Sequence, residues 1–227
     1  RTRFHQGQFA NVSQDRVDHY IEYYRKRPQI FQTLSKRSSK YIYFIEQAAR
    51  EKNIPAELVL LPIIESSFDV FAYSHGQAAG LWQFIPSTGT HLGLQQNWWY
   101  DGRRDIYAAT HAAFNYLNEM HRFFDGDWLL AIAAYNGGPG TVQRAQRKNI
   151  KANKKADYWS LELPKETMNY VPKLLALAEI FNDPNKYGVT LHSVPNHAYL
   201  SKVDIDSQID LAQAAKLAEL SIDDLYA

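Results

Sequence analysis

The sequence of 227 residues contains no cysteine, which excludes a disulfide framework, a thiolate metal site and a cysteine nucleophile. It carries no excess of either charge, because 25 Lys and Arg oppose 24 Asp and Glu, and the net charge of +1 indicates no nucleic-acid partner. No apolar run approaches the roughly 18 residues of a membrane span, and no signal peptide is recognisable at the N-terminus, which begins with Arg1.

Familiar catalytic signatures are also missing. The sequence contains no HExxH, CxxC, GxGxxG, P-loop or GxSxG pattern. Its eight histidines do not have the spacing of metal ligands on one helix face. We therefore expect neither a metal site nor an organic cofactor.

The residues that are present favour a predominantly helical, all-α fold. Apolar side chains make up 45% of the chain and recur at helical spacing over most of its length. Helices are predicted near residues 17–24, 41–53, 55–68, 104–124, 127–136, 166–181 and 211–220, with further ones after Pro86, from Thr141 and from Ile222. Pro62 predicts a kink in the helix over 55–68. The polar stretch 147–155 (RKNIKANKK) predicts a solvated surface loop.

Changes in the sequence pattern along the chain divide it into three parts. Residues 1–54 are interpreted as an N-terminal helical prop, and residues 55–186 as the main domain. Residues 187–227, where short extended stretches precede a helix, are interpreted as a small C-terminal appendage. The first residue is not methionine, so we expect a processed or trimmed piece of a longer protein.

Glu65 is the most informative single residue, because it follows a run that is apolar on all sides. Apolar surroundings disfavour an ionised carboxylate and raise its pKa, and a place in the last turn of a helix acts in the same direction. A carboxylic acid that stays protonated near neutral pH is what a general acid requires, and glycoside cleavage by lysozyme depends on such a group. The alternative is a structural carboxylate paired with an arginine or a backbone amide.

Asp69 lies four residues after Glu65 and would share its face if the helix continued. A second catalytic carboxylate would suit glycoside hydrolysis. Asp69 is equally well placed as a polar residue that ends the helix. Without a clear second carboxylate, glycan cleavage would require the substrate to supply part of its own chemistry.

Four motifs occur in an order that resembles the soluble-type lytic murein transglycosylases, which share a fold with goose-type lysozyme. They are Glu65–Phe68 (ESSF), Gly80–Pro86 (GLWQFIP), Ala134–Gly138 (AYNGG) and Glu166–Pro172 (ETMNYVP). The resemblance implies a goose-type lysozyme-like catalytic domain over residues 55–186. It also implies cleavage of the β-1,4 bond between N-acetylmuramic acid and N-acetylglucosamine in peptidoglycan. Glu65 would act first as acid and then as base, leaving a 1,6-anhydromuramoyl end.

The resemblance also implies substrate-binding residues. Ser74 would hydrogen-bond near the reacting muramoyl sugar, although it also suits a turn, and the Gln83 amide would line the cleft. Tyr135 would hold Glu65 through its hydroxyl, with Asn136 beside it. Glu166 and Tyr170 lie one helical turn apart, so both could face the cleft. Alternatively, Glu166 starts a helix and Tyr170 is a core aromatic residue.

Other aromatic residues have two interpretations each. Trp82 is either a core residue or a platform for a sugar ring. Trp98, Trp99 and Tyr100 form a cluster in loop sequence that suits sugar stacking or burial under the loop. Residues 209–225 weakly resemble the helices of a LysM glycan-binding module and otherwise form a plain helical cap.

Two further functions remain open at this stage: a hydrolytic muramidase that uses Glu65 with an activated water, and a non-catalytic peptidoglycan-binding module. The expected partner is the glycan strand of peptidoglycan, bound by a monomer. The resemblance implies a bacterial periplasmic protein tethered to the outer membrane by a segment outside this chain.

Overall fold

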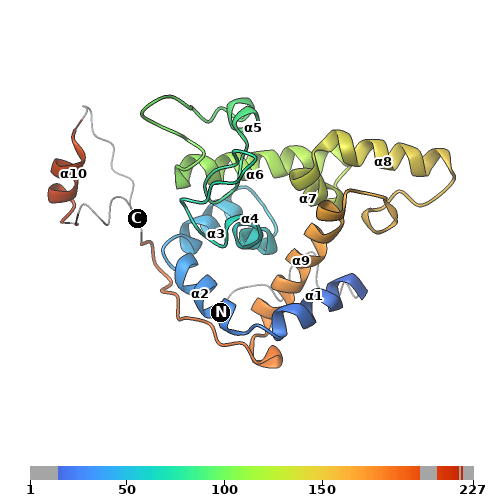
Figure 1. The fold of residues 1–227 in the computed structure, drawn as a ribbon, viewed down its shortest axis with the longest axis horizontal. Helices are drawn as coiled ribbons and strands as arrows, with labels where there is room; N and C mark the ends of the chain where they lie inside the picture. The colour runs from blue at the N-terminus through green and yellow to red at the C-terminus, as the bar shows by residue number, and fades with distance from the viewer. Residues whose placement is uncertain (1–14, 200–208, 220, 222–227) are drawn as a thin grey trace.

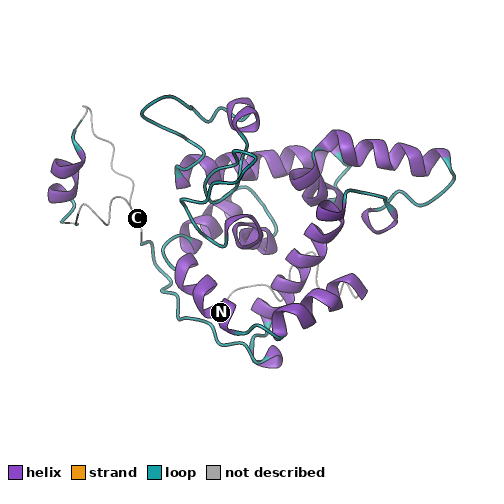
Figure 2. Ribbon diagram, in the orientation of Figure 1, coloured by secondary structure: helices purple, strands orange, loops and turns teal. Residues whose placement is uncertain are grey.

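The computed structural model describes residues 15–199, 209–219 and 221, and within these residues it is helical, with only isolated bridges between extended residues (Figure 2). The elements are α1 (Asp15–Arg25), α2 (Gln29–Ser38), α3 (Ile42–Glu51), η2 (Ala56–Leu60), α4 (Leu61–Ser66), α5 (Pro86–His91), α6 (Ile106–Phe123), α7 (Trp128–Gly137), α8 (Pro139–Lys151), η3 (Tyr158–Ser160), α9 (Lys165–Asn182), η4 (Asn185–Tyr187) and α10 (Leu211–Leu217). The predicted helical fold is confirmed.

Helix α7 forms the centre of the core. It is apolar all round, and Leu130–Ala134 are buried, so each of its faces needs a cover. Helices α6, α8 and α9 cover these faces by packing against α7 (Figure 1). The N-termini of α6 and α7 are fixed by Asp105 and Asp127, whose carboxylates accept hydrogen bonds from the backbone N–H three residues later.

The N-terminal helices support this core from one side. Helix α1 lies along α9, and Arg16 donates hydrogen bonds to the carbonyls of Met168 and Trp159. Phe31 of α2 packs edge-on against Phe181 of α9, with ring centroids 5.6 Å apart. These contacts agree with a helical prop, while the predicted domain boundaries themselves stay predictions.

The segment expected to form one kinked helix over 55–68 consists of two short ones, so this prediction is wrong in its detail. Residues 56–60 form the 3-10 helix η2, and α4 begins at Leu61 with Pro62 in its first turn. Proline has no N–H to donate and is tolerated only in the first turn of an α-helix. The change of helix type therefore falls directly before Pro62.

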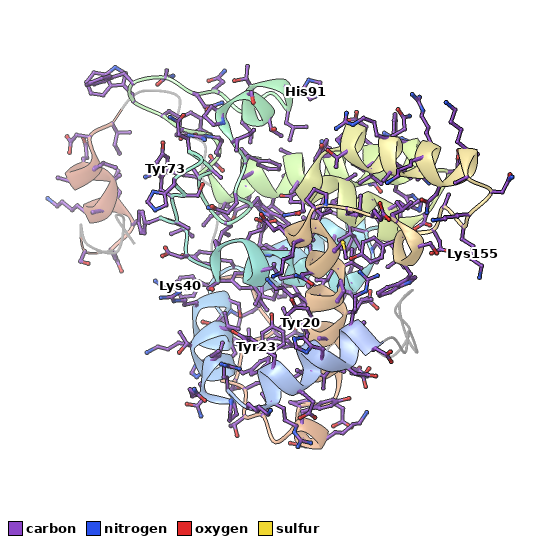
Figure 3. The ribbon with its side chains drawn as sticks, turned by 45° about the vertical axis from the view of Figure 1, so that its right-hand side comes forward. Tyr20, Tyr23, Lys40, Tyr73, His91 and Lys155 are labelled. Atoms are coloured by element: carbon purple, nitrogen blue, oxygen red, sulfur yellow. The ribbon has the colours of Figure 1, made fainter. Side chains whose placement is uncertain are left out.

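The predicted surface loop over 147–155 is also partly wrong, because α8 continues to Lys151. Its basic residues lie on the solvent side of a helix whose buried side carries Val142 and Asn149. Figure 3 shows Lys155, in the turn that follows, on the opposite side of the molecule from Tyr73. Arg, Lys and Gln are good helix formers, so a polar run need not be a loop.

Beyond α9 the chain turns back along the N-terminal helices. Val189 is buried, and the backbone N–H of His192 donates to Ser35 Oγ of α2 at 2.7 Å. Residues 189–199 form no regular element, and α10 stands apart from the other helices in Figure 1. The predicted helix from Ile222 lies outside the described residues, as do residues 200–208 of the region expected to contain short extended stretches. No helix of the described residues is long and apolar enough to cross a membrane.

Candidate active site

Glu65 occupies the last turn of α4, as predicted from the sequence. The helix ends in two consecutive residues with left-handed backbone, Ser67 at φ 54° and Phe68 at φ 57°. Their N–H groups donate to the carbonyls of Ile63 and Pro62, which closes the helix in the manner usually reserved for glycine. Left-handed backbone is costly for residues with a Cβ, and burial of the Phe68 ring in the core holds it in place.

Glu65 is hydrogen-bonded by Tyr170 of α9, whose hydroxyl donates to Glu65 Oε1. Burial raises the pKa of Glu65 from 4.5 to about 7. The Tyr170 hydrogen bond lowers this pKa and the charge of Glu166 raises it, so burial prevails. Glu65 as a whole residue is nevertheless intermediate in exposure and not fully covered by the protein. These are the properties of a general acid.

Tyr135 does not make the contact predicted for it. Its hydroxyl donates to the carbonyl of Trp82 at 2.9 Å, so it fastens α7 to the segment after Gly80 instead of holding Glu65. Sequence reasoning assigned the hydrogen bond to the wrong tyrosine. The two tyrosines lie in the same neighbourhood, since burial followed by the charge of Glu65 raises the pKa of both Tyr135 and Tyr170 well above 10.

Trp82 is a core residue and not a sugar platform. Its ring is fully buried and packs edge-on against Phe114, with centroids 5.2 Å apart. Its indole N–H donates to Thr110 Oγ1 at 3.0 Å, so the one polar atom of the side chain is satisfied. Trp82 thus anchors the segment that carries Gln83.

Asn136 and Glu166 contact each other, and the charge of Glu166 acts on Glu65. The Asn136 amide donates to Glu166 Oε1 at 3.0 Å, and its oxygen accepts from Thr167 Oγ1 at 2.8 Å. The ends of α7 and α9 approach closely here, because a Cβ on Gly137 would lie 2.6 Å from Thr167 Oγ1. Thr167 was not singled out from the sequence, where a threonine in a helix carries no distinctive signal.

Gln83 lies in a tight loop directly joined to the helix of the acid. Its backbone is left-handed at φ 50°, and its amide donates to the carbonyls of Gly80 at 2.8 Å and Ala72 at 3.2 Å. Ser66 Oγ, one residue after Glu65, donates to the Leu81 carbonyl at 3.0 Å. The Gln83 Oε1 atom accepts no hydrogen bond from the described residues and is left for a ligand.

Ser74 and Asp69 take local structural roles in this structure. Ser74 Oγ accepts from the N–H of Ala78 at 3.0 Å, and this closes a turn without contact to Glu65 among the described residues. Asp69 Oδ1 accepts from the N–H of Phe71 at 2.9 Å and so shapes the exit from α4. The interpretation of Asp69 as a helix-ending residue is the one that the structure supports.

Arg103 is a residue that sequence reasoning missed. It is 5% exposed, and its guanidinium forms a bidentate pair with Asp101 at 2.9 and 2.7 Å. The same group donates to the carbonyls of Gln77 at 2.7 Å and Phe84 at 3.1 Å. Arg103 therefore joins three parts of residues 67–105, which we call the site loops, although it does not touch Glu65. A basic residue in a polar stretch resembles any solvated arginine, so no sequence signal marks it.

A metal site is not formed by this arrangement. Within residues 15–199, 209–219 and 221, no three His, Asp or Glu side chains lie close enough together to hold an ion.

Comparisons with known proteins agree on one family. A family model described as the transglycosylase SLT domain matches residues 42–158. Membrane-bound lytic murein transglycosylase D of Escherichia coli K12 is 43% identical over 211 residues, which cover 93% of this chain and 47% of the relative. The chain thus spans about half the length of this relative.

Two further matches differ in sequence identity and in the share of the chain that they cover. A putative tributyltin chloride resistance protein of an Alteromonas species is 34% identical over 194 residues, 86% of this chain and 92% of that protein. Among solved structures, an inactive mutant of the lytic transglycosylase Slt from Pseudomonas aeruginosa matches with a TM-score of 0.46 and 23% identity. That match covers 63% of this chain and 24% of the other.

Proposed function

Since this chain belongs to the transglycosylase SLT family, we propose that it is a lytic transglycosylase acting on peptidoglycan. It cleaves the β-1,4 bond between N-acetylmuramic acid and N-acetylglucosamine. The observation that carries the proposal is the state of Glu65, a carboxyl with a pKa of about 7 beside the hydroxyl of Tyr170. One residue of this kind can serve as an acid and then as a base near neutral pH.

The proposed reaction needs no second carboxylate and no water. Protonated Glu65 gives its proton to the glycosidic oxygen, and the bond from that oxygen to C1 of the muramoyl sugar breaks. The C6 hydroxyl oxygen of the same sugar bonds to C1, and its proton passes to the Glu65 carboxylate. The products are a free 4-hydroxyl on one fragment and a 1,6-anhydro ring on the other, and Glu65 ends protonated as it began.

The other residues have supporting roles in this proposal. Tyr170 is a positioning residue that fixes one oxygen of Glu65. Gln83 offers its Oε1 to a sugar N–H or O–H, because its amide N–H groups are already bound to the backbone. Asn136 and Glu166 form a polar rim that can hydrogen-bond the glycan, and Ser74 contributes its hydroxyl hydrogen.

The same relationship supports a proposal about location. Curated relatives are named as membrane-bound lytic murein transglycosylases. We place this protein in the bacterial periplasm, at the outer membrane, where peptidoglycan is accessible.

Product analysis tests the proposal against the hydrolytic alternative. Purified peptidoglycan is digested with the protein, and the fragments are examined by mass spectrometry. Ends in 1,6-anhydromuramic acid are one water lighter than reducing ends and support the transglycosylase. Reducing ends would instead establish a muramidase, with Glu166, whose charge acts on Glu65, as a candidate to orient a water.

A variant separates catalysis from binding. Glu65→Gln keeps the acceptor for Tyr170 but has no proton to give, so we expect the rate to fall by roughly 10²- to 10⁴-fold. Sedimentation with insoluble peptidoglycan should show binding retained. Cleavage at the original rate would rule out Glu65 as the acid, and binding without cleavage in the unaltered protein would indicate a non-catalytic module.

A further inference from the structure

Exposed aromatic rings are concentrated on the site loops. Of the eight exposed Phe, Tyr and Trp side chains among the described residues, five lie between residues 71 and 100. They are Phe71, Tyr73, Trp98, Trp99 and Tyr100. Figure 3 shows Tyr73 projecting from the loop that precedes α5. Exposed apolar side chains gathered in one part of a protein surface mark an interaction site.

Trp98 and Trp99 are the extreme members of this group. Each is 90% exposed, whereas Trp82 and Trp128 are buried in the core. The loop that carries them extends outward between α5 and α6 in Figure 1. The packing of the fold therefore gives no reason for two neighbouring indoles at this position, and the interpretation as rings buried under the loop is wrong.

The backbone beneath the two indoles is well fixed. Asn97 Oδ1 accepts from the N–H groups of Trp99 and Tyr100 at 2.8 and 2.9 Å, and Asn97 N–H donates to the Tyr100 carbonyl at 2.9 Å. The Tyr100 hydroxyl donates to Asp105 at 2.9 Å. A pair of rings held on a fixed loop loses little conformational entropy on binding.

This loop is also joined to the loop that carries Gln83. Asp101, at its end, holds the Arg103 guanidinium that binds the Phe84 carbonyl. The next residue, Arg104, places its guanidinium 5.9 Å from the ring of Tyr73. The exposed rings thus lie on loops that are fixed to the loop carrying Gln83.

The charge of the loop indicates what kind of ligand it binds. No Lys or Arg occurs between Pro86 and Gly102. A loop that inserts tryptophan into an anionic membrane surface usually adds basic residues beside it. Two flat indoles in a stretch without Lys or Arg suit the apolar C–H face of a β-linked pyranose ring, against which an aromatic ring can stack. The basic residues at the end of the loop are already engaged, Arg103 with Asp101 and Arg104 over the ring of Tyr73.

We propose that Trp98 and Trp99 form an outer subsite that binds the glycan strand of peptidoglycan beyond the cleavage position. The inference rests on the proposed function, because it takes the same polymer as ligand. The outer subsite acts on long strands, which can reach Glu65 and the indole pair together. Each added contact makes the strand leave more slowly.

The test compares binding without cleavage. The Glu65→Gln variant and the variant that adds Trp98→Ala and Trp99→Ala are each sedimented with purified insoluble peptidoglycan. Two lost stacking contacts predict a half-saturation concentration about tenfold higher. The matched control adds Phe123→Ala, which removes an exposed ring from the other end of α6 and should leave binding unchanged. Circular dichroism establishes that every variant is folded.

Several outcomes would overturn the inference. Equal binding with and without the two indoles would do so, as would an equal loss in the Phe123→Ala control. Both variants are also sedimented with vesicles of phosphatidylethanolamine and phosphatidylglycerol. Vesicle binding that depends on the indoles, with unchanged peptidoglycan binding, would identify a membrane-contacting loop instead.

A second readout keeps this inference apart from the proposed function. In the otherwise unaltered protein, Trp98→Ala with Trp99→Ala should reduce cleavage of intact peptidoglycan more than cleavage of a short tetrasaccharide fragment. If the unaltered protein cleaves nothing, the proposed function fails whatever the binding shows. If it cleaves and the two substrates are affected equally, only the outer subsite fails.

Discussion

The helices α6, α7 and α9, which we call the helical floor, differ sharply from the site loops in how they are held. The floor consists of apolar helices that cover one another. Four of the eight non-glycine residues with positive φ in the described chain fall within residues 67–83, and side-chain hydrogen bonds join the site loops in addition to their backbone ones. Glu65 stands where the two meet, in a helix of only six residues.

The helical floor and the site loops contribute different parts of the candidate site. The floor provides Tyr170 on a rigid surface, and burial against it raises the pKa of Glu65. The site loops provide the polar and aromatic groups that a polymer can touch. Backbone in unfavourable conformations is often found beside functional sites, where the surrounding structure compensates for it. The comparison predicts that removing one specific contact in the site loops lowers stability strongly. Removing a similar contact elsewhere on the surface should have little effect.

The largest effect is expected from Arg103→Leu. Its loss leaves Asp101 and two carbonyls without their donor, so the free energy of unfolding should fall by about 4 kcal/mol, as measured by urea denaturation. Lys148→Ala is the matched control, because it removes an ion pair of similar length, 2.6 Å, at an exposed position. There the loss should be far smaller, because water screens the pair. Equal losses would show that the loops do not depend on Arg103.

Two glycines in left-handed conformation give the next comparison. Gly80→Ala would place a Cβ 2.2 Å from the Arg103 carbonyl oxygen at φ +75°, whereas Gly93→Ala, at φ +78°, meets nothing within 4 Å. We expect about 3 kcal/mol of destabilisation at residue 80, from backbone strain and overlap together. At residue 93 strain alone acts, and about 1 kcal/mol is expected. Thermal unfolding of both variants decides whether the close approach matters.

Glu65 itself should make stability depend on pH. Its pKa is raised on folding from 4.5 to about 7, so the folded state holds the proton more tightly than the unfolded state. The contribution of this protonation to the free energy of unfolding is fully present below pH 4.5. It is lost as the pH rises through about 7. Glu65→Gln should therefore unfold like the unaltered protein at pH 4 and be more stable at pH 8, by at most about 3 kcal/mol. The same difference at both pH values would contradict the raised pKa.

The smallest effects are shifts of the pH profile. Tyr170→Phe removes a hydrogen bond that lowers the pKa of Glu65, so the alkaline limb of kcat/KM should move to higher pH. Glu166→Gln removes a neighbouring negative charge and keeps an acceptor for Asn136, so the limb should move to lower pH. Shifts in one common direction would mean that these residues act through the fold and not through the charge of Glu65.

The sequence predicted the helical floor well because its signals are local. Apolar spacing and the Asp105 and Asp127 caps lie within the segments that they define. The acid could be found for the same reason, since the apolar run beside Glu65 is visible without knowing the fold. The helix over residues 147–151 was missed because its buried side carries few apolar residues.

The site could be predicted only in outline. Glu65 and Tyr170 are separated by 105 positions, and the motifs that name both tyrosines do not say which hydroxyl reaches the acid. The role of Arg103 depends on carbonyls from two other loop segments. Contacts of this kind are set by how distant segments meet, which periodicity does not record.

The Arg103 guanidinium has a consequence for the timing of motion in the site loops. Because it is hydrogen-bonded to Gln77, Phe84 and Asp101 together, the opening of any one of these segments disturbs a side chain that also holds the other two. The backbone amides of Ala79 and Gly102, which belong to separate loops, should then exchange hydrogen with solvent through one shared opening event. A glycan strand bound to one loop would slow hydrogen exchange in the other loop without contacting it. The segments would then respond to substrate as a single cooperative unit.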